Sequence, residues 1–128
     1  MSKKRKYISK KIRDSVLKMF DGACAYCGDS DKPLELDHIE PVASSRCKED
    51  ESNYLPACKI CNRFKAAMTL EQFRSEILSQ NERLFRYSVN ARMARRYGMI
   101  RETGVKEVVF YFEAIKRKRA EIKKEVEG

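Results

Sequence analysis

The chain contains a single histidine, no tryptophan and three prolines in 128 residues. No apolar run approaches the roughly 18 residues of a membrane-spanning helix, which argues against a membrane protein. The N-terminal residues lack the apolar run and the small-residue cleavage pattern of a secretory signal. These absences predict a cytoplasmic, reducing compartment, where cysteines are more often metal ligands than disulfide partners.

Acidic residues are in the minority. The 28 Lys and Arg residues outnumber the 19 Asp and Glu residues, so the formal net charge is +9. Such an excess is typical of proteins with a polyanionic partner, usually nucleic acid and less often an acidic membrane surface. A chain of this length favours a single domain whose modest core gains stability from a metal site.

Within residues 1–128 we expect one domain with a basic arm over 1–8, a core over about 20–68 and a mainly helical extension over 69–128. The arm fits a phosphate-contacting tail and a solvated tail about equally well. Apolar spacing, capping residues and alternation predict the elements. Strands are expected over 34–39 and over 105–112, and a short strand or a turn is expected around 53–55. Helices are expected over 10–20 (capped by Ser9), 59–68, from about 70, 81–97 and 113–126. The fold class predicted is therefore α+β.

Two Cys-x-x-Cys pairs, Cys24 with Cys27 and Cys58 with Cys61, are separated by 30 residues. Four thiolates suit tetrahedral zinc, and the two-residue gap lets one tight turn aim both sulfurs at one point. The alternatives are reduced structural cysteines or an adventitious iron site. Cys47, in a polar stretch, is expected to be a free thiol without function.

The only histidine, His38, lies between these pairs and directly follows Asp37. Aspartate is a hard oxygen ligand for magnesium or manganese, and histidine is the usual general base near neutral pH. In a regular strand the two side chains would point to opposite faces, so both serve one site only if the strand ends or distorts there. The nearby Pro41 permits that.

Asn62 follows Cys61, so a helical step turns it away from the zinc, and its carbonyl can join Asp37 on a second, catalytic cation. Lys65, three positions further on, lies on the same helical face and is predicted to meet a phosphate. Positive charge also clusters outside this stretch. The further predicted nucleic-acid contacts are Arg63, Arg92, Arg95 and Arg96, for which the alternative is a solvated face.

Together, the pattern Cys-x-x-Cys, Asp-His-Ile-x-Pro, Asn-x-Leu and Cys-x-x-Cys-Asn-x-x-Lys resembles the HNH endonuclease family over roughly residues 20–68. The resemblance implies a ββα-metal fold around one catalytic divalent cation. It implies that His38 is the general base, that Asp37 and Asn62 bind the cation, and that Asn53 orients the loop between the strands.

This sequence departs from the family pattern in two places: Asn62 replaces the third-position histidine, and residues 42–52 lack the glycines common in the loop. The segment Phe110–Glu113 resembles the tail of some small phage-type HNH proteins.

The sequence thus predicts a DNA endonuclease that contains structural zinc and depends on magnesium or manganese. One alternative is a zinc-knuckle nucleic-acid-binding module without catalysis, which gives no reason for Asp37, His38 and Asn62 together. The other is a structural or protein-interaction domain, which leaves the charge excess unexplained. Cutting both strands requires two sites, so a double-strand cutter is expected to be a homodimer.

Overall fold

The computed structural model describes residues 8–31, 33–39 and 51–127. The chain forms two compact units. The first, here the hairpin unit, comprises Met1–Leu70 and Val109–Gly128, and the second, here the helical unit, comprises Glu71–Val108. The assignment of the whole chain to one domain stays a prediction.

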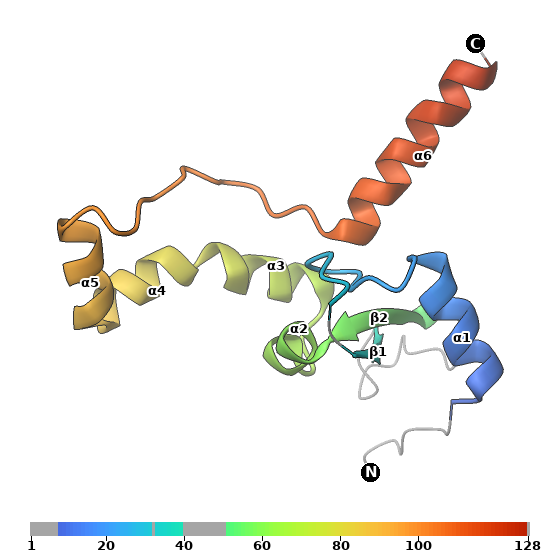
Figure 1. Ribbon diagram of the computed structural model, residues 1–128, viewed down its shortest axis with the longest axis horizontal. Helices are drawn as coiled ribbons and strands as arrows, with labels where there is room; N and C mark the ends of the chain where they lie inside the picture. Colours follow the sequence, from blue (N-terminus) through green and yellow to red (C-terminus); the bar gives the residue numbers. More distant parts are fainter. Residues whose placement is uncertain (1–7, 32, 40–50, 128) are drawn as a thin grey trace. The chain divides into compact units, whose positions relative to one another are not determined.

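The hairpin unit is built on two antiparallel strands, β1 (Leu34–His38) and β2 (Tyr54–Cys58), paired from Leu34 opposite Cys58 to His38 opposite Tyr54. A short 3₁₀ turn, η1 (Glu51–Asn53), leads into β2, and α2 (Lys59–Lys65) follows it directly (Figure 1). The strand predicted over 34–39 is confirmed, and the strand or turn expected around 53–55 is a strand that is longer than expected. Strand, strand and helix form a ββα arrangement.

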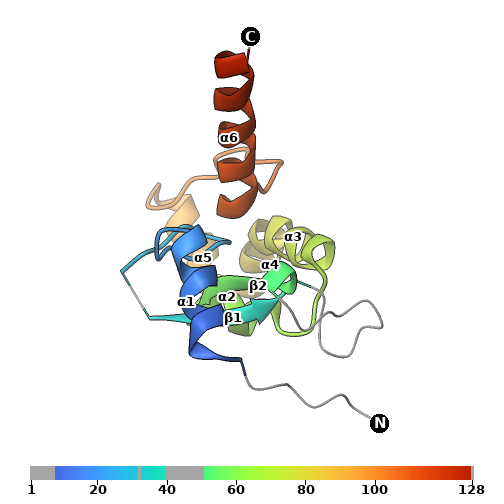
Figure 2. The same ribbon diagram turned by 90° about the vertical axis from the view of Figure 1, so that its right-hand side faces the viewer.

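Helix α1 (Lys10–Met19) packs on one face of this hairpin (Figure 2). Its buried Val16 contacts Leu36 and Tyr54, with Ile8 and Ile12 at the margin of the cluster. The predicted cap is confirmed: Ser9 Oγ accepts a hydrogen bond from the Ile12 amide at 3.3 Å. Because side chains alternate along a strand, Asp37 lies on the hairpin face opposite Leu36.

Helix α2 ends at Lys65 instead of continuing to residue 68. Ala66 adopts a left-handed conformation (φ 47°), and the Met68 amide turns back to the Lys65 carbonyl. The predicted apolar side of this helix is exposed, with Ile60 at 68%, whereas Lys65 is fully buried. Cysteine, asparagine and lysine side chains therefore hold this helix to the hairpin.

The strand predicted over residues 105–112 is wrong. Residues 101–110 have no regular structure, and α6 (Tyr111–Glu127) begins inside the predicted strand. A β-branched, aromatic segment forms a strand only where a partner strand exists. Here the amides of Tyr111 and Phe112 donate instead to the carbonyls of Tyr26 (3.1 Å) and Ala25 (2.8 Å).

Helix α3 (Leu70–Leu78), most of which belongs to the helical unit, begins where the capping-box pattern Thr69-Leu70-Glu71-Gln72 predicts a helix start. The single helix expected over 81–97 is divided into α4 (Gln80–Tyr87) and α5 (Val89–Arg96). Ser88 is extended (φ −110°, ψ 112°), and its hydroxyl accepts from the Ala91 amide at 3.1 Å, so it begins a new helix. None of the helices in the described ranges has the length and apolarity needed to cross a membrane.

Candidate active site

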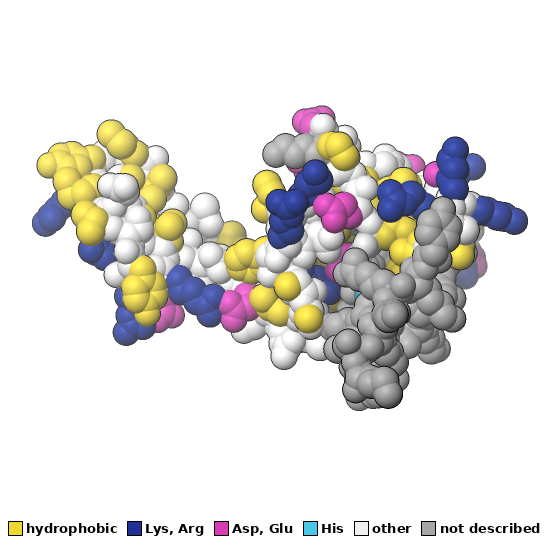
Figure 3. Space-filling view, turned by 90° about the horizontal axis from the view of Figure 1, so that it is seen from below, with side chains coloured by type: hydrophobic (Ala, Val, Ile, Leu, Met, Phe, Trp, Pro, Cys, Tyr) yellow, Lys and Arg dark blue, Asp and Glu magenta, His cyan; other side chains and the backbone are white. Residues whose placement is uncertain are grey.

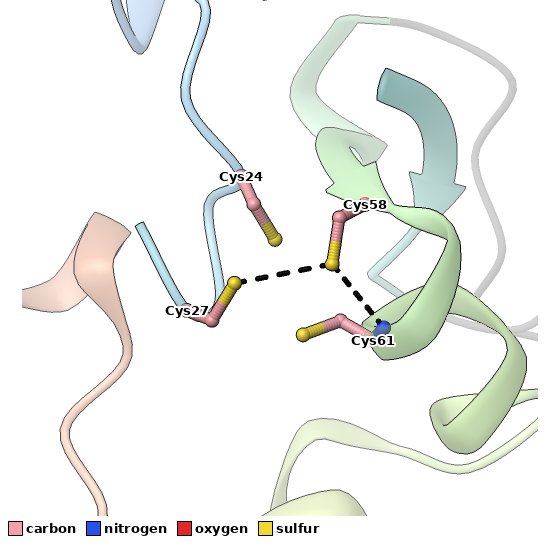
Figure 4. A group of neighbouring side chains, drawn as sticks. All are labelled: Cys24, Cys27, Cys58 and Cys61. Carbon is pink, nitrogen blue, oxygen red and sulfur yellow. Dashed lines mark hydrogen bonds between the residues drawn. The ribbon is translucent and has the colours of Figure 1, made fainter. Parts of the chain in front are cut away.

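The four predicted zinc ligands converge (Figure 4). Their sulfur atoms all lie within 4.8 Å of one another, and Cys27 Sγ is 3.9 Å from Cys58 Sγ. Sulfurs about 2.3 Å from a central zinc form a tetrahedron with edges of about 3.8 Å, so this cluster fits a tetrahedral ion. The fifth cysteine, Cys47, lies outside the described residues.

Backbone hydrogen bonds order the first cysteine turn and tie it to β2. The Gly28 amide donates to the Cys24 carbonyl at 2.9 Å, and the Ala25 amide ties the turn to the Pro56 carbonyl of β2 at 2.8 Å. Gly28 has φ 82°, and a Cβ there would lie 3.3 Å from the Tyr111 ring, so both the backbone and the close approach favour glycine.

One thiol of the cluster is predisposed to ionise. A hydrogen bond from Cys61 lowers the pKa of Cys24, outweighing the burial that opposes it. The same interaction and burial raise the pKa of Cys61. The thiolate is the form of cysteine that binds metal, so a lowered pKa at Cys24 suits the role of a metal ligand.

Asp37 is buried in a charged cluster on the hairpin face opposite Leu36. Its Oδ2 accepts a hydrogen bond from the Tyr26 hydroxyl at 2.6 Å and lies 2.9 Å from Lys65 Nζ. Lys65 Nζ also donates to the His38 carbonyl at 3.0 Å. Burial, and then the neighbouring Asp37 carboxylate, raise the pKa of Tyr26, so its hydroxyl stays protonated and acts as the donor.

The burial of Lys65 differs from what its position in the motif suggested. Its side chain is 0% exposed and its ammonium group faces Asp37, so in this structure it is not at the surface. A buried charge of this kind is tolerated because it is paired and hydrogen-bonded. A contact between Lys65 and a phosphate stays a prediction.

Asn62 lies beside this cluster and has a partner that sequence reasoning missed. Its Nδ2 donates to Glu35 Oε2 at 2.9 Å. Glu35 and Asp37 are two positions apart on one face of β1, a relationship that strand alternation alone could have revealed. The side chains of Glu35, Asp37 and Asn62 supply hard oxygen atoms, the donor set that magnesium and manganese favour.

His38 is placed differently from Asp37. It is the last residue of β1, so the strand ends there, as one site shared by Asp37 and His38 requires. Its buried imidazole, however, packs edge-on against Tyr54, with ring centroids 5.0 Å apart. Asn53 is also buried, and its carbonyl accepts from the Ile39 amide at 2.9 Å, which joins the two ends of the loop between the strands. The structure thus brings Asp37 to Lys65 and Tyr26, and His38 to Tyr54.

The predicted nucleic-acid contacts are not equivalent. Arg63 and Arg96 are exposed. Arg92 Nη1 donates to the carbonyls of Phe85 (2.9 Å) and Arg86 (2.8 Å), so it holds α5 to the end of α4. Arg95 stacks on the Phe85 ring at 4.0 Å and pairs with Glu102 at 3.2 Å.

Fold and site together define an α+β protein whose ββα unit is joined to a preceding turn by a four-cysteine cluster. Residues 24–67 match the family model of the HNH endonucleases, and the match includes both cysteine pairs, the hairpin and α2. This segment is therefore an HNH-family domain, as the sequence resemblance predicted.

Among solved structures, the chain is similar to the crystal structure of the Type II-C Cas9 enzyme from Actinomyces naeslundii. The two are 29% identical with a TM-score of 0.48, over 58% of this chain and 8% of that one. The chain therefore spans only a small part of that enzyme's length. Comparison with curated proteins gave no match.

Proposed function

We propose that this protein is a DNA endonuclease that hydrolyses phosphodiester bonds with one divalent cation, magnesium or manganese, and carries a structural zinc. The observation that supports it most is the position of Asp37, His38 and Asn62 in a ββα unit that lies wholly inside the HNH match. A zinc-knuckle module that only binds nucleic acid needs none of these three side chains.

In this proposal the zinc has a structural role. Cys24, Cys27, Cys58 and Cys61 hold it, and it joins the turn before β1 to the first turn of α2. That connection fixes where α2 begins. It thereby sets the position of Asn62, one residue beyond the last ligand.

Asp37 and Asn62 are the proposed ligands of the catalytic cation. Asp37 supplies a carboxylate oxygen whose orientation is set by two donors, and Asn62 supplies its amide oxygen. Glu35, bonded to Asn62, either adds a ligand or orients the amide. When bound, the cation stabilises the charge that develops on the phosphate and the leaving oxygen.

His38 is the proposed general base. It accepts a proton from a water molecule whose oxygen attacks phosphorus, and the bond from phosphorus to the leaving oxygen breaks. The family resemblance implies products with a 3′-hydroxyl and a 5′-phosphate. Asn53 is proposed to orient the loop that begins beyond Ile39.

DNA is the proposed substrate because the chain carries a formal charge of +9. Arg63 and Arg96 present exposed cationic groups, and Lys65, Arg92 and Arg95 are further proposed contacts. A cytoplasmic location, and a homodimer if both strands are cut, are the corresponding proposals for where and how the protein acts.

Incubation of zinc-loaded protein with supercoiled plasmid tests the proposal. We expect conversion to nicked or linear DNA with magnesium or manganese, and none when EDTA is present or when Asp37 is changed to Ala at low metal concentration. High manganese is expected to restore part of the Asp37→Ala activity. Protein that binds the plasmid but cuts neither DNA nor RNA with any divalent cation would favour the binding module instead.

A further inference from the structure

Tyr26 occupies a middle position of the first Cys-x-x-Cys turn, yet it is only 4% exposed. Its ring contacts Phe110 and Phe112 edge-to-face, with centroids 5.3 and 6.3 Å apart. Its carbonyl accepts the amide of Tyr111 at 3.1 Å. Backbone and ring are therefore both held by the start of α6, which leaves the hydroxyl little freedom of position.

That hydroxyl points at the proposed cation ligand. It donates to Asp37 Oδ2 at 2.6 Å, and Lys65 Nζ approaches the same oxygen to 2.9 Å. Two donors on one carboxylate oxygen fix the rotation of the carboxylate. Asp37 would then hold a cation through a carboxylate whose orientation is already fixed.

We infer that Tyr26 is a positioning residue that orients Asp37 for the catalytic cation and connects that site to the zinc-binding turn. The connection is short, because Tyr26 directly precedes the zinc ligand Cys27. Zinc holds the turn, the turn holds Tyr26, and Tyr26 holds the carboxylate. This inference rests on the proposed function, since it requires Asp37 to bind the cation.

The competing explanation is that Tyr26 only fills space between the cysteine turn and α6. The two explanations separate on removal of the hydroxyl alone, because Tyr26→Phe retains the ring and its contacts with Phe110 and Phe112. Tyr111→Phe is the matched control. It removes a hydroxyl from a half-buried tyrosine whose ring packs on the same turn at Gly28.

The test is a manganese titration of zinc-loaded protein, followed by electron paramagnetic resonance of the free ion. Loss of hydrogen bonds to a metal ligand typically costs about 10–100-fold in metal affinity. We expect Tyr26→Phe to weaken manganese binding by that factor, to keep its zinc, and to recover cleavage at saturating manganese. Tyr111→Phe should match the wild type.

This inference would be overturned if Tyr26→Phe bound manganese with wild-type affinity while Asp37→Ala lost manganese binding. The proposed function would then remain intact. If Asp37→Ala also binds manganese normally and the wild type cuts no DNA, this inference and the proposed function both fail.

Should Tyr26→Phe fold poorly, ¹³Cζ-tyrosine resonances of the wild type provide a second readout. Magnesium should shift the Tyr26 resonance, because the Asp37 carboxylate that accepts its hydrogen bond becomes a cation ligand. A resonance that does not move at saturating magnesium would contradict the inference.

Discussion

The hairpin unit and the helical unit differ in what they bury. The hairpin unit buries polar groups as well as apolar ones, among them Asp37, His38, Asn53 and Lys65. Within the described residues of the helical unit, Phe73 and Ala91 are the buried side chains, while Tyr87 is 76% exposed. Hydrophobic side chains are correspondingly visible over α4 and α5 in Figure 3. Long-range contacts therefore specify the hairpin unit, whereas local capping and short-range ion pairs specify the helical unit.

Removing the zinc site should have the largest effect, because it should destabilise the hairpin unit more than the helical unit. Zinc binding in small domains is worth on the order of 10 kcal/mol, comparable to the stability of a whole domain. We expect Cys58→Ser to lose zinc and to lose amide protection in β1 and β2. Amides of α4 and α5 should change less, since a unit with few buried side chains already exchanges fast.

Cys47→Ser is the control for the zinc prediction and should keep one zinc per chain. Elemental analysis together with hydrogen exchange checks both variants. Folded, purified wild-type protein without zinc would refute the structural role given to the cluster.

Phe110 tests whether the start of α6 stabilises the hairpin unit. Its buried ring contacts Tyr26 and stacks on Phe112 at 6.1 Å. Phe110→Ala should therefore lower the free energy of unfolding by about 3–5 kcal/mol, the usual loss for a buried phenylalanine. Val109→Ala, at a 40% exposed neighbour, should cost far less in urea unfolding. Equal losses would mean that residues 110–112 do not hold the cysteine turn.

Each unit has a helix whose start is capped by a serine hydroxyl, so the same substitution can be made in both. Ser9 accepts from the Ile12 amide in the hairpin unit, and Ser88 accepts from the Ala91 amide in the helical unit. Each change to alanine should cost about 1 kcal/mol. We expect Ser9→Ala to lower the global unfolding midpoint and Ser88→Ala to accelerate mainly the exchange of the Ala91 amide. The same fall in midpoint for both would remove the distinction between the units.

The smallest expected effect concerns the exposed charge of the helical unit. If Arg96 contacts one phosphate, Arg96→Gln should make the dependence of log affinity on log salt shallower by about 0.9. Arg92→Gln should also loosen the junction of α4 and α5, because its guanidinium bonds two carbonyls there. Fluorescence anisotropy with duplex DNA over a salt series measures the slope. An unaltered slope for Arg96→Gln would identify a solvated face.

The elements that sequence predicted well have local signals. Alternation gave β1, the Ser9 cap gave the start of α1, and the capping box gave the start of α3. Residues 105–112 misled because strand propensity assumes a partner strand, and the partner of Tyr111 and Phe112 is the turn at Ala25 and Tyr26. The division at Ser88 had a local signal, a serine able to cap, that helical periodicity obscured.

The residues of the candidate site likewise fall into those that sequence spacing predicts and those that it does not. The spacing of the cysteines is enough to predict that their sulfurs converge, since each pair is fixed by one turn. The partners of Asp37 are not predictable from spacing, because Tyr26 and Lys65 lie 11 and 28 positions away and meet only after the hairpin, the turn and α2 have packed. Lysine is rarely buried, so composition places Lys65 at the surface.

The decisive measurement for the proposed mechanism is the rate of plasmid cleavage by His38→Ala with manganese. His38 is the only histidine, so no other imidazole can act as the base. We predict a fall on the order of 10²–10⁴-fold, the usual loss for a general base, with zinc content and DNA affinity retained. Cleavage by His38→Ala at the wild-type rate would contradict it.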